Sequence, residues 1–247
     1  MKTGLIHRPH PGLPRLATHL RLDDTPVPPA VEWHRRIVLN GDALGNDVHS
    51  NCVEAAALRS IQIRRVWAAG DERAPTVDDA LALYRRWSAW DGREITDIGT
   101  ASDTAAARWA AFGIWWDEQW EDVPTIAALD PTNATHMRAA IAWLGPVQLD
   151  INLPAAWQGL TSWTQASGAE GAPGSWGAHR VCASGYDAAY LYAVSWGRLV
   201  QITWDAIARY ALNAETTVSR AWLDVDGRSP AGFDIDALES RAAALAA

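Results

Sequence analysis

Apolar side chains recur at helical spacing along the first half of the chain. Between residues 52 and 68 ("CVEAAALRSIQIRRVWA") they are interrupted by basic residues, which predicts a helix that is well buried at its start. Asn51 and Glu54 have the spacing of a capping box, so Cys52 is expected in the first turn. Similar patterns predict helices over 76–90, 102–114 and 132–145, the first with Thr76 as its N-cap and the other two ending at Gly113 and Gly145.

After residue 145 the pattern changes to the alternation that is typical of strands. The segment "PVQLDINL" (146–153) predicts a half-buried strand, and 179–197 predicts two strands joined by a Gly-Tyr-Asp turn. Further elements are a strand over 199–204, a short helix over 204–212 and a terminal helix over 233–247, whereas the Gly-containing stretch 158–178 predicts a long loop of the kind that is often functional. Because helices come first and strands follow, we expect an α+β fold in which a helical half packs on an antiparallel half.

The first 40 residues form a separate segment, a Pro-rich extended arm, ahead of one domain over 41–247. Six of the 13 prolines lie within residues 1–30, and this stretch has no apolar periodicity. Proline lacks a backbone donor and favours extended conformations, so the arm is ordered only by contacts. Those contacts are either with its own domain, as a strap, or with a neighbouring subunit.

Composition limits the classes of function. The net charge of −8 gives no overall attraction to nucleic acid or to an anionic membrane, and neither partner is expected. We expect no signal peptide and a cytoplasmic location, because prolines interrupt residues 1–20 and the two cysteines are too few for a disulfide framework. The seven histidines show no paired ligand spacing, so neither a metal nor a cofactor is expected.

The candidate chemistry centres on Cys52. A helix N-terminus favours a thiolate, and Asn46, six residues earlier, offers a side-chain N–H to a developing oxyanion. A base has to come from elsewhere in the chain. His179 is the best placed of the histidines, since it opens a predicted strand directly after the Gly-rich loop. Cys52 as an ordinary small core residue is the alternative, and position alone leaves both interpretations open.

The order of the motifs resembles the papain-like cysteine peptidase superfamily. A cysteine at a helix start is followed by "GPVQLDI", by "GAHRVCASGYD" and by "YAVSWG". The resemblance implies a papain-like α+β fold with Cys52 as nucleophile and His179 as base. Asn46 takes the place of the oxyanion Gln, and Trp196 is expected to pack beside the histidine. Ser195 and Asp150 are further supporting residues.

One departure from that pattern concerns the residue that orients the histidine. The superfamily has an Asn there, and Val194 occupies its place, so either Ser195 or a backbone carbonyl is left to orient the ring. Losing an orienting group costs about 10⁴ in kcat in serine-protease triads. The sequence therefore predicts either slow hydrolysis or a chain that has lost activity.

A second resemblance covers almost the whole chain. "LGNDVHSNCVEAA", "YAVSWGRLVQITWDAIARYALNAE" and "PAGFDIDAL" are similar to phage and prophage proteins of undefined function, whose usual motif is Asn-Asp-x-x-Gly-Asp-Cys. It implies a phage-associated cysteine peptidase or amidase acting through a Cys–His dyad on a peptide or amide substrate. The alternative is a weak or inactive structural or attachment component of a phage-like particle, in contact with neighbouring virion subunits through the arm.

Overall fold

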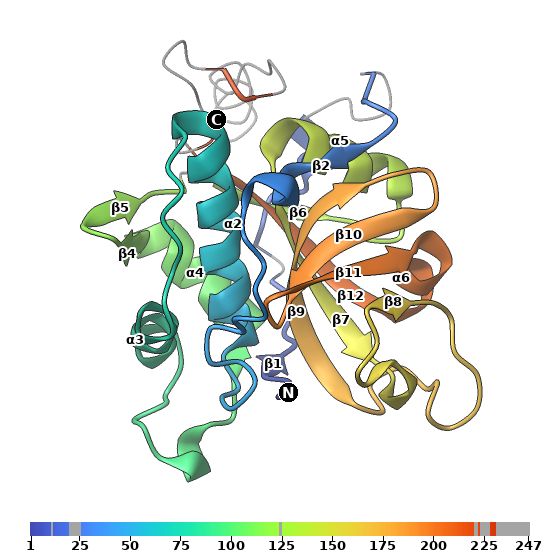
Figure 1. Ribbon diagram of the computed structural model, residues 1–247, viewed down its shortest axis with the longest axis horizontal. Helices are drawn as coiled ribbons and strands as arrows, with labels where there is room; N and C mark the ends of the chain where they lie inside the picture. Colours follow the sequence, from blue (N-terminus) through green and yellow to red (C-terminus); the bar gives the residue numbers. More distant parts are fainter. Residues whose placement is uncertain (11, 20–25, 124, 220–221, 223–227, 231–247) are drawn as a thin grey trace.

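The computed structural model describes residues 1–10, 12–19, 26–123, 125–219, 222 and 228–230, and it divides into a helical half and a sheet half (Figure 1). The helical half contains α2 (Cys52–Ala69), α3 (Val77–Trp87), α4 (Ser102–Phe112) and a hairpin of β4 (Ile114–Trp116) and β5 (Gln119–Glu121). Short 3₁₀ turns lie at Trp33–Arg36, Glu94–Thr96 and Ala155–Trp157. The predicted α+β arrangement is confirmed.

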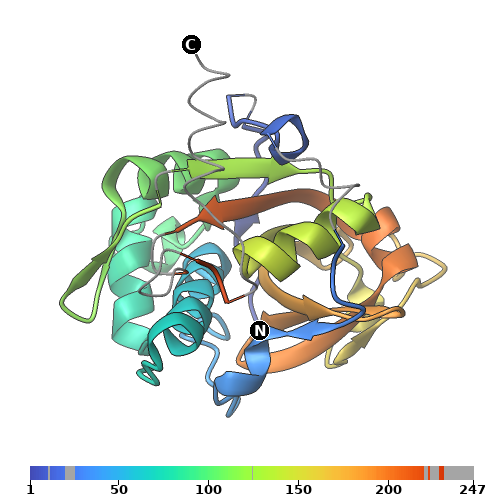
Figure 2. The ribbon, with the colours of Figure 1, turned by 90° about the horizontal axis from the view of Figure 1, so that it is seen from above.

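The sheet half is built on one large, mostly antiparallel sheet. In the described part of the chain its order is β6 (Thr125–Leu129), β12 (Ala211–Val218), β7 (Val147–Leu153), β9 (Gly177–Tyr186), β10 (Tyr190–Ser195), β11 (Arg198–Thr203) and β8 (Ser162–Trp163). Strand β2 (Val31–Glu32) also pairs with β9, and only the β11–β8 pair is parallel. Helices α5 (Ala134–Leu144) and α6 (Trp204–Tyr210) pack on this half, and Figure 2 shows α5 lying along the sheet.

Helix α2 joins the two halves, because it is buried on nearly every side. Its Ala, Val and Ile residues pack against α3 on one side and β9 on the other. The buried arginines of such a helix need partners, so Arg64 donates to the carbonyl of Pro146 at 3.0 Å and Arg65 pairs with Glu121. The helix ends at Gly70, whose φ of 68° is the left-handed conformation of a helix C-terminus.

The N-terminal arm lies across its own domain. Strand β1 (Leu5–Ile6) pairs in parallel with β3 (Thr100–Ala101), between the two halves of the molecule (Figure 1). Farther along, the one-turn helix α1 (Leu16–His19) follows a bridge between Arg15 and Ala128 of β6. Leu5 and Leu16 are buried, so the arm contributes to the core of this chain. The described helices include none long and apolar enough to span a bilayer.

Several local predictions were wrong. Strand β7 is buried on both faces rather than one, because Gln148 donates to Ala56 of α2 while Leu149 faces the core beneath α5. Helices and strands are also less separated than predicted, since β4, β5 and β6 precede α5 and β6 joins the main sheet. The predicted loop 158–178 contains β8, and the predicted terminal helix lies outside the described residues.

The prediction of a capping box at the start of helix α2 was wrong as well. Asn51 is the N-cap residue, but its side chain donates to the Leu44 carbonyl at 2.9 Å. Glu54 accepts a hydrogen bond from Thr100 instead of reaching back to the N-cap. Both side chains therefore bond to tertiary partners instead of to the helix N-terminus. Thr76, the expected N-cap of α3, does form a complete capping box with Asp79.

Candidate active site

Cys52 is the first residue of α2 and lines a small cavity between the two halves. Its side chain is 1% exposed, and backbone N–H groups of Arg180 and Gly4 approach the sulfur. Burial raises the pKa of the thiol to about 12, and the nearby carboxylates of Glu54 and Asp150 act in the same direction. The thiol is therefore protonated at neutral pH in this arrangement, although it heads a helix.

His179 lines the same cavity from the third position of β9, opposite Ile151 of β7. Its Nε2 lies 2.9 Å from Ser195 Oγ, while its Nδ1 is buried without a hydrogen-bond partner among the described residues. Burial lowers the pKa of the imidazole to about 3, so the ring is neutral. If the ring proton is on Nε2 and is donated to Ser195, Nδ1 carries a lone pair that can accept the Cys52 proton.

A tight turn places two residues against the His179 ring. Trp196 and Gly197 connect β10 to β11 and have φ values of 47° and 69°, as a two-residue type I′ turn requires. The indole of Trp196 stacks on the imidazole with ring centroids 4.1 Å apart and planes 12° from parallel. The predicted packing of Trp196 beside His179 is confirmed, and Ser195, on the same turn, supplies the hydroxyl partner of the ring.

Asn46 and Val194 line this cavity too, each with a limit on its role. Asn46 is 2% exposed, and its Nδ2 donates to the His49 carbonyl at 2.9 Å. A primary amide has two N–H groups, so one donor remains for a substrate oxygen. Val194 is buried in β10 opposite Cys182 of β9, and its apolar side chain makes no hydrogen bond to His179.

Asp150 is not part of the cavity wall. It forms a bidentate pair with Arg180, in which Nη2 and Oδ2 are 3.0 Å apart, and Glu215 approaches the same guanidinium at 3.2 Å. Burial alone lowers the pKa of Arg180, but these two carboxylates raise it above its ordinary value. Because Arg180 follows His179 in β9, this cluster fixes the strand next to the ring. Asp150 therefore supports the site from behind.

Sequence reasoning missed Arg180, Glu215 and the buried carboxyl of Glu54. Glu54 Oε1 accepts a hydrogen bond from Thr100, but Oε2 has no partner among the described residues. Burial raises the pKa of Glu54 to about 7. The available signal was an acidic residue two positions after the candidate nucleophile, in the first turn of a helix predicted to be buried at its start.

Residues 2–4 of the arm lie against Cys52, Asn46 and Trp196, three of the residues that line the cavity. Lys2 donates its backbone N–H to the Asn46 carbonyl at 3.1 Å and accepts a hydrogen bond from the Trp196 indole at 3.2 Å. Its ammonium group pairs with Asp97 at 3.1 Å, and Gly4 packs against the backbone of Ser50. What remains is a cavity of about 20 Å³, room for about one water molecule. A peptide therefore reaches Cys52 only when this part of the arm moves.

The side chains that the structure describes include no cluster of three or more His, Cys, Asp or Glu that could hold a metal ion. The arrangement is a cysteine, a histidine and an amide in one enclosed space. Such a set suits nucleophilic attack on a carbonyl.

Solved structures with the same fold are cysteine proteases. Xylellain, a cysteine protease from Xylella fastidiosa, matches with a TM-score of 0.63 and 12% identity over 87% of this chain and 95% of that one. The procathepsin B S9 of Trypanosoma congolense matches with a TM-score of 0.62 and 10% identity over 88% and 86%. The Carica candamarcensis protease CMS1MS2 gives 0.55 and 14% over 78% and 99%. No family model and no curated protein matches the sequence.

The chain therefore has a papain-like fold, as its motif order predicted. At 10–14% identity the likeness concerns the fold alone. These comparisons do not show the resemblance to phage and prophage proteins.

Proposed function

We propose that this protein is a papain-like cysteine hydrolase that cleaves peptide or amide bonds through Cys52 and His179. The observation that carries the proposal is the state of the His179 ring. Ser195 holds its Nε2, and its Nδ1 is left without a partner in the same cavity as the Cys52 thiol. Thiol activation needs a base that is held in position through one ring nitrogen while the other nitrogen can accept the thiol proton.

The reaction follows from these atoms. His179 Nδ1 takes the proton of the Cys52 thiol, and the thiolate attacks the carbonyl carbon of the substrate. The imidazolium then protonates the leaving amine as the C–N bond breaks and a thioester forms. Water, deprotonated by the neutral His179, attacks the thioester and releases the acid and the Cys52 thiol. Ser195 keeps the ring in one orientation through both steps, and Trp196 shields it from water.

The negative oxygen of the tetrahedral intermediate needs donors near Cys52. The backbone N–H of Cys52 is at the start of α2, where such groups have no partner within the helix. The second N–H of Asn46 is the other donor. Oxyanion donors of this kind are each worth roughly 10²–10³ in kcat.

The closed cavity defines the resting state. With the pKa of Cys52 raised to about 12 and that of His179 lowered to about 3, the thiolate–imidazolium pair is strongly disfavoured while residues 2–4 cover the site. Movement of the arm admits water and substrate. Water reverses the desolvation that mainly causes both pKa shifts, so the pKa of Cys52 falls and that of His179 rises. The protein is therefore a hydrolase whose activity depends on opening.

A fluorogenic peptide library tests the function directly. The wild-type chain should turn over a subset of the peptides, and Cys52→Ala should abolish turnover. Ser195→Ala should lower kcat by about 10²-fold with little change in KM, because an unheld ring loses its productive orientation but not its place. Ser195→Thr, which keeps the hydroxyl, is the matched control and should retain most activity. Turnover that survives Cys52→Ala contradicts the proposal.

The alternative is a structural or attachment component of a phage-like particle. It is favoured by the closed cavity and by Val194 at the position where the superfamily has an orienting amide. The phage association itself rests on the sequence motifs. Absence of turnover, together with co-purification of the chain with particles from a producing strain, would support this second function.

A further inference from the structure

A larger cavity lies away from Cys52, between the arm and the edge of the main sheet. Its volume is about 540 Å³, within the range of small-molecule sites. One wall is the arm from His7 to Ala17, and the other consists of the end of β6, the first turn of α5 and two residues of β12. Nothing in the proposed hydrolysis uses this space.

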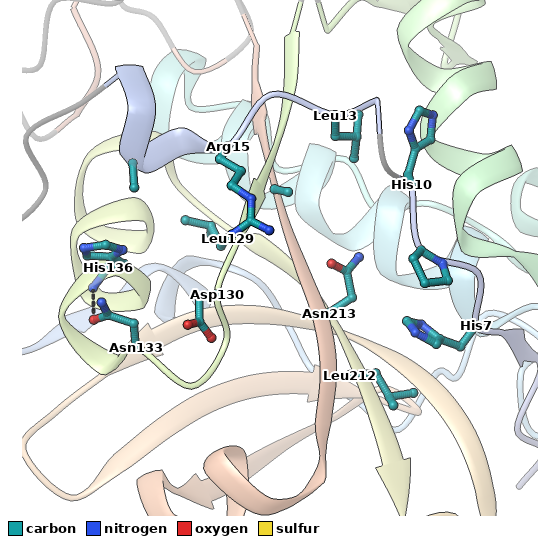
Figure 3. A pocket seen from close by; sticks show the side chains of 13 residues that line it. His7, His10, Leu13, Arg15, Leu129, Asp130, Asn133, His136, Leu212 and Asn213 are labelled. Carbon is teal, nitrogen blue, oxygen red and sulfur yellow. Dashed lines mark hydrogen bonds between the residues drawn. The ribbon is translucent and has the colours of Figure 1, made fainter.

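The arm wall is fixed to the sheet by backbone contacts. Ala128 of β6 donates its N–H to the Pro14 carbonyl at 2.8 Å, and Arg15 is bridged to the same residue. Figure 3 shows Arg15 reaching down from the arm toward Leu129, with Asp130 below it. The side chain of Asn213 projects from β12, and His7 lies farther to the right. The cavity is thus a built space between two elements that are bonded to each other.

Hydrogen-bond donors predominate among the side chains on its polar surface. Arg15, His7, His10 and His136 all line it, while Asp130 is the only carboxylate among its lining residues. The first turn of α5, capped by the Asn133 side chain, adds the positive end of a helix dipole. On the count that gives the whole chain a net charge of −8, Arg15 and Asp130 balance, so this lining is less acidic than the chain as a whole.

Two polar atoms in this wall lack a partner. The Nδ1 atoms of His7 and His10 make no hydrogen bond among the described residues, and because both atoms are buried they face the cavity only when the rings turn. Apolar side chains complete the surface, namely Leu13, Leu129 and Leu212. Donors grouped beside an apolar floor suit a ligand with an acidic group and a hydrocarbon body.

We infer that this cavity binds a small organic anion, a carboxylate or phosphate ester on an apolar body, held between the arm and the sheet. Arg15 is the charged partner of the anion, and the histidine rings donate N–H groups to it. Asp130 opposes the anion. Its own pKa is kept below the ordinary value by a hydrogen bond from the Thr132 hydroxyl, with smaller contributions from the nearby His136 and Arg15.

Titration calorimetry with probes of one shape and different charge tests the inference. The probes are benzoate and phenyl phosphate as anions, benzamidine as the matched cation and benzyl alcohol as the neutral form, each added to the full chain. Both anions should bind at least about tenfold more tightly than benzamidine, since the charge difference is felt at close range in a partly enclosed site. Equal affinity for benzoate and benzamidine overturns the inference.

Three variants locate the binding. Arg15→Gln should weaken benzoate binding about fivefold, and Asp130→Asn should strengthen it about threefold, because one removes the attraction and the other the repulsion. Arg8→Gln is the matched control, since it removes the same charge from an exposed arm residue outside the cavity. An equal loss in Arg8→Gln and Arg15→Gln overturns the assignment. Cys52→Ala should bind benzoate as the wild type does, so this result is independent of whether the chain is a hydrolase.

Discussion

Substituting Gly4 by alanine should open the candidate active site. Gly4 lies between the backbones of Ser50 and Gly99, and a Cβ built on it collides with the Ser50 carbonyl group. Both partners are backbone, so the collision is relieved only by moving the chain. Ser50 leads directly into the buried helix α2 and donates its N–H to Asp97 at 2.8 Å, so we expect the arm to move rather than the Ser50 loop. We therefore expect Gly4→Ala to displace residues 2–5 from Cys52.

The size of the effect follows from the pKa of the thiol. At pH 8 a thiol with a pKa of about 12 is ionised in roughly one molecule in 10⁴. If opening restores a value near the ordinary 9.0, about one molecule in ten is ionised. Because thiolate is the reactive form, alkylation of Cys52 by iodoacetamide should accelerate by up to about 10³-fold. Less acceleration is expected if the carboxylates of Glu54 and Asp150 keep part of the shift.

Peptide mapping by mass spectrometry measures the rate at each cysteine. Cys182 is buried in β9, and burial raises its pKa to about 12 as well, so it serves as an internal control for general loosening of the fold. Gly12→Ala is the matched variant, because a Cβ there meets only the His10 side chain at 3.5 Å, an ordinary contact. The reasoning is refuted if Gly4→Ala labels Cys52 no faster than Gly12→Ala, or if Cys182 accelerates equally.

Three further results are expected. Val194→Asn should raise kcat by about tenfold, less than the ~10⁴ that a complete loss of orientation costs, because Ser195 already holds His179; an unchanged rate in a folded variant would contradict this. Deleting residues 2–28 should lower the melting temperature by about 10 °C, since two buried leucines are lost; an unchanged melting temperature with loss of assembly would instead identify a partner-binding arm. Glu54 has its folded pKa raised to about 7 from 4.5, so its contribution to stability is intact below pH 4.5 and is lost as pH rises through 7. Glu54→Gln should therefore gain up to about 3 kcal/mol over the wild type at pH 8 relative to pH 4, measured by urea unfolding, and a constant difference across that range would refute it.

The candidate site residues could be predicted because they lie in motifs that are local in the chain. Cys52 heads a helix with a continuous apolar pattern, and Ser195 and Trp196 belong to a turn whose glycine is visible in the sequence. The position of His179 next to Trp196 needed the motif order as well. No local sequence feature predicts that β9 and β10 bring the rings of His179 and Trp196 together.

The remainder depended on tertiary contacts. Arg180 and Glu215 are 35 positions apart, and their pairing exists only because β12 and β9 flank β7. Strands β4 to β6 were not predicted because each has only three to five residues, too few to show a clear alternation. The contacts of Lys2 with Asn46 and Trp196 could not be predicted from composition, because tertiary contacts decide the path of a Pro-rich arm.

The arm connects the two proposed sites, and this connection has a thermodynamic consequence. Residues 2–4 cover Cys52, and the arm from His7 onward forms one wall of the larger cavity. A ligand that needs this wall in place stabilises the seated arm by RT ln(1 + [L]/Kd), about 2.7 kcal/mol at a concentration of 100 Kd. If opening requires the arm to leave both sites together, benzoate at that concentration should slow Cys52 alkylation in the wild type by about 100-fold. If benzoate binds but leaves the rate unchanged, residues 2–4 open alone and the two sites are independent. Arg15→Gln separates the cases, because binding weakened fivefold makes the same benzoate concentration about 20 Kd, and alkylation should then be slowed only about 20-fold where the two sites are coupled.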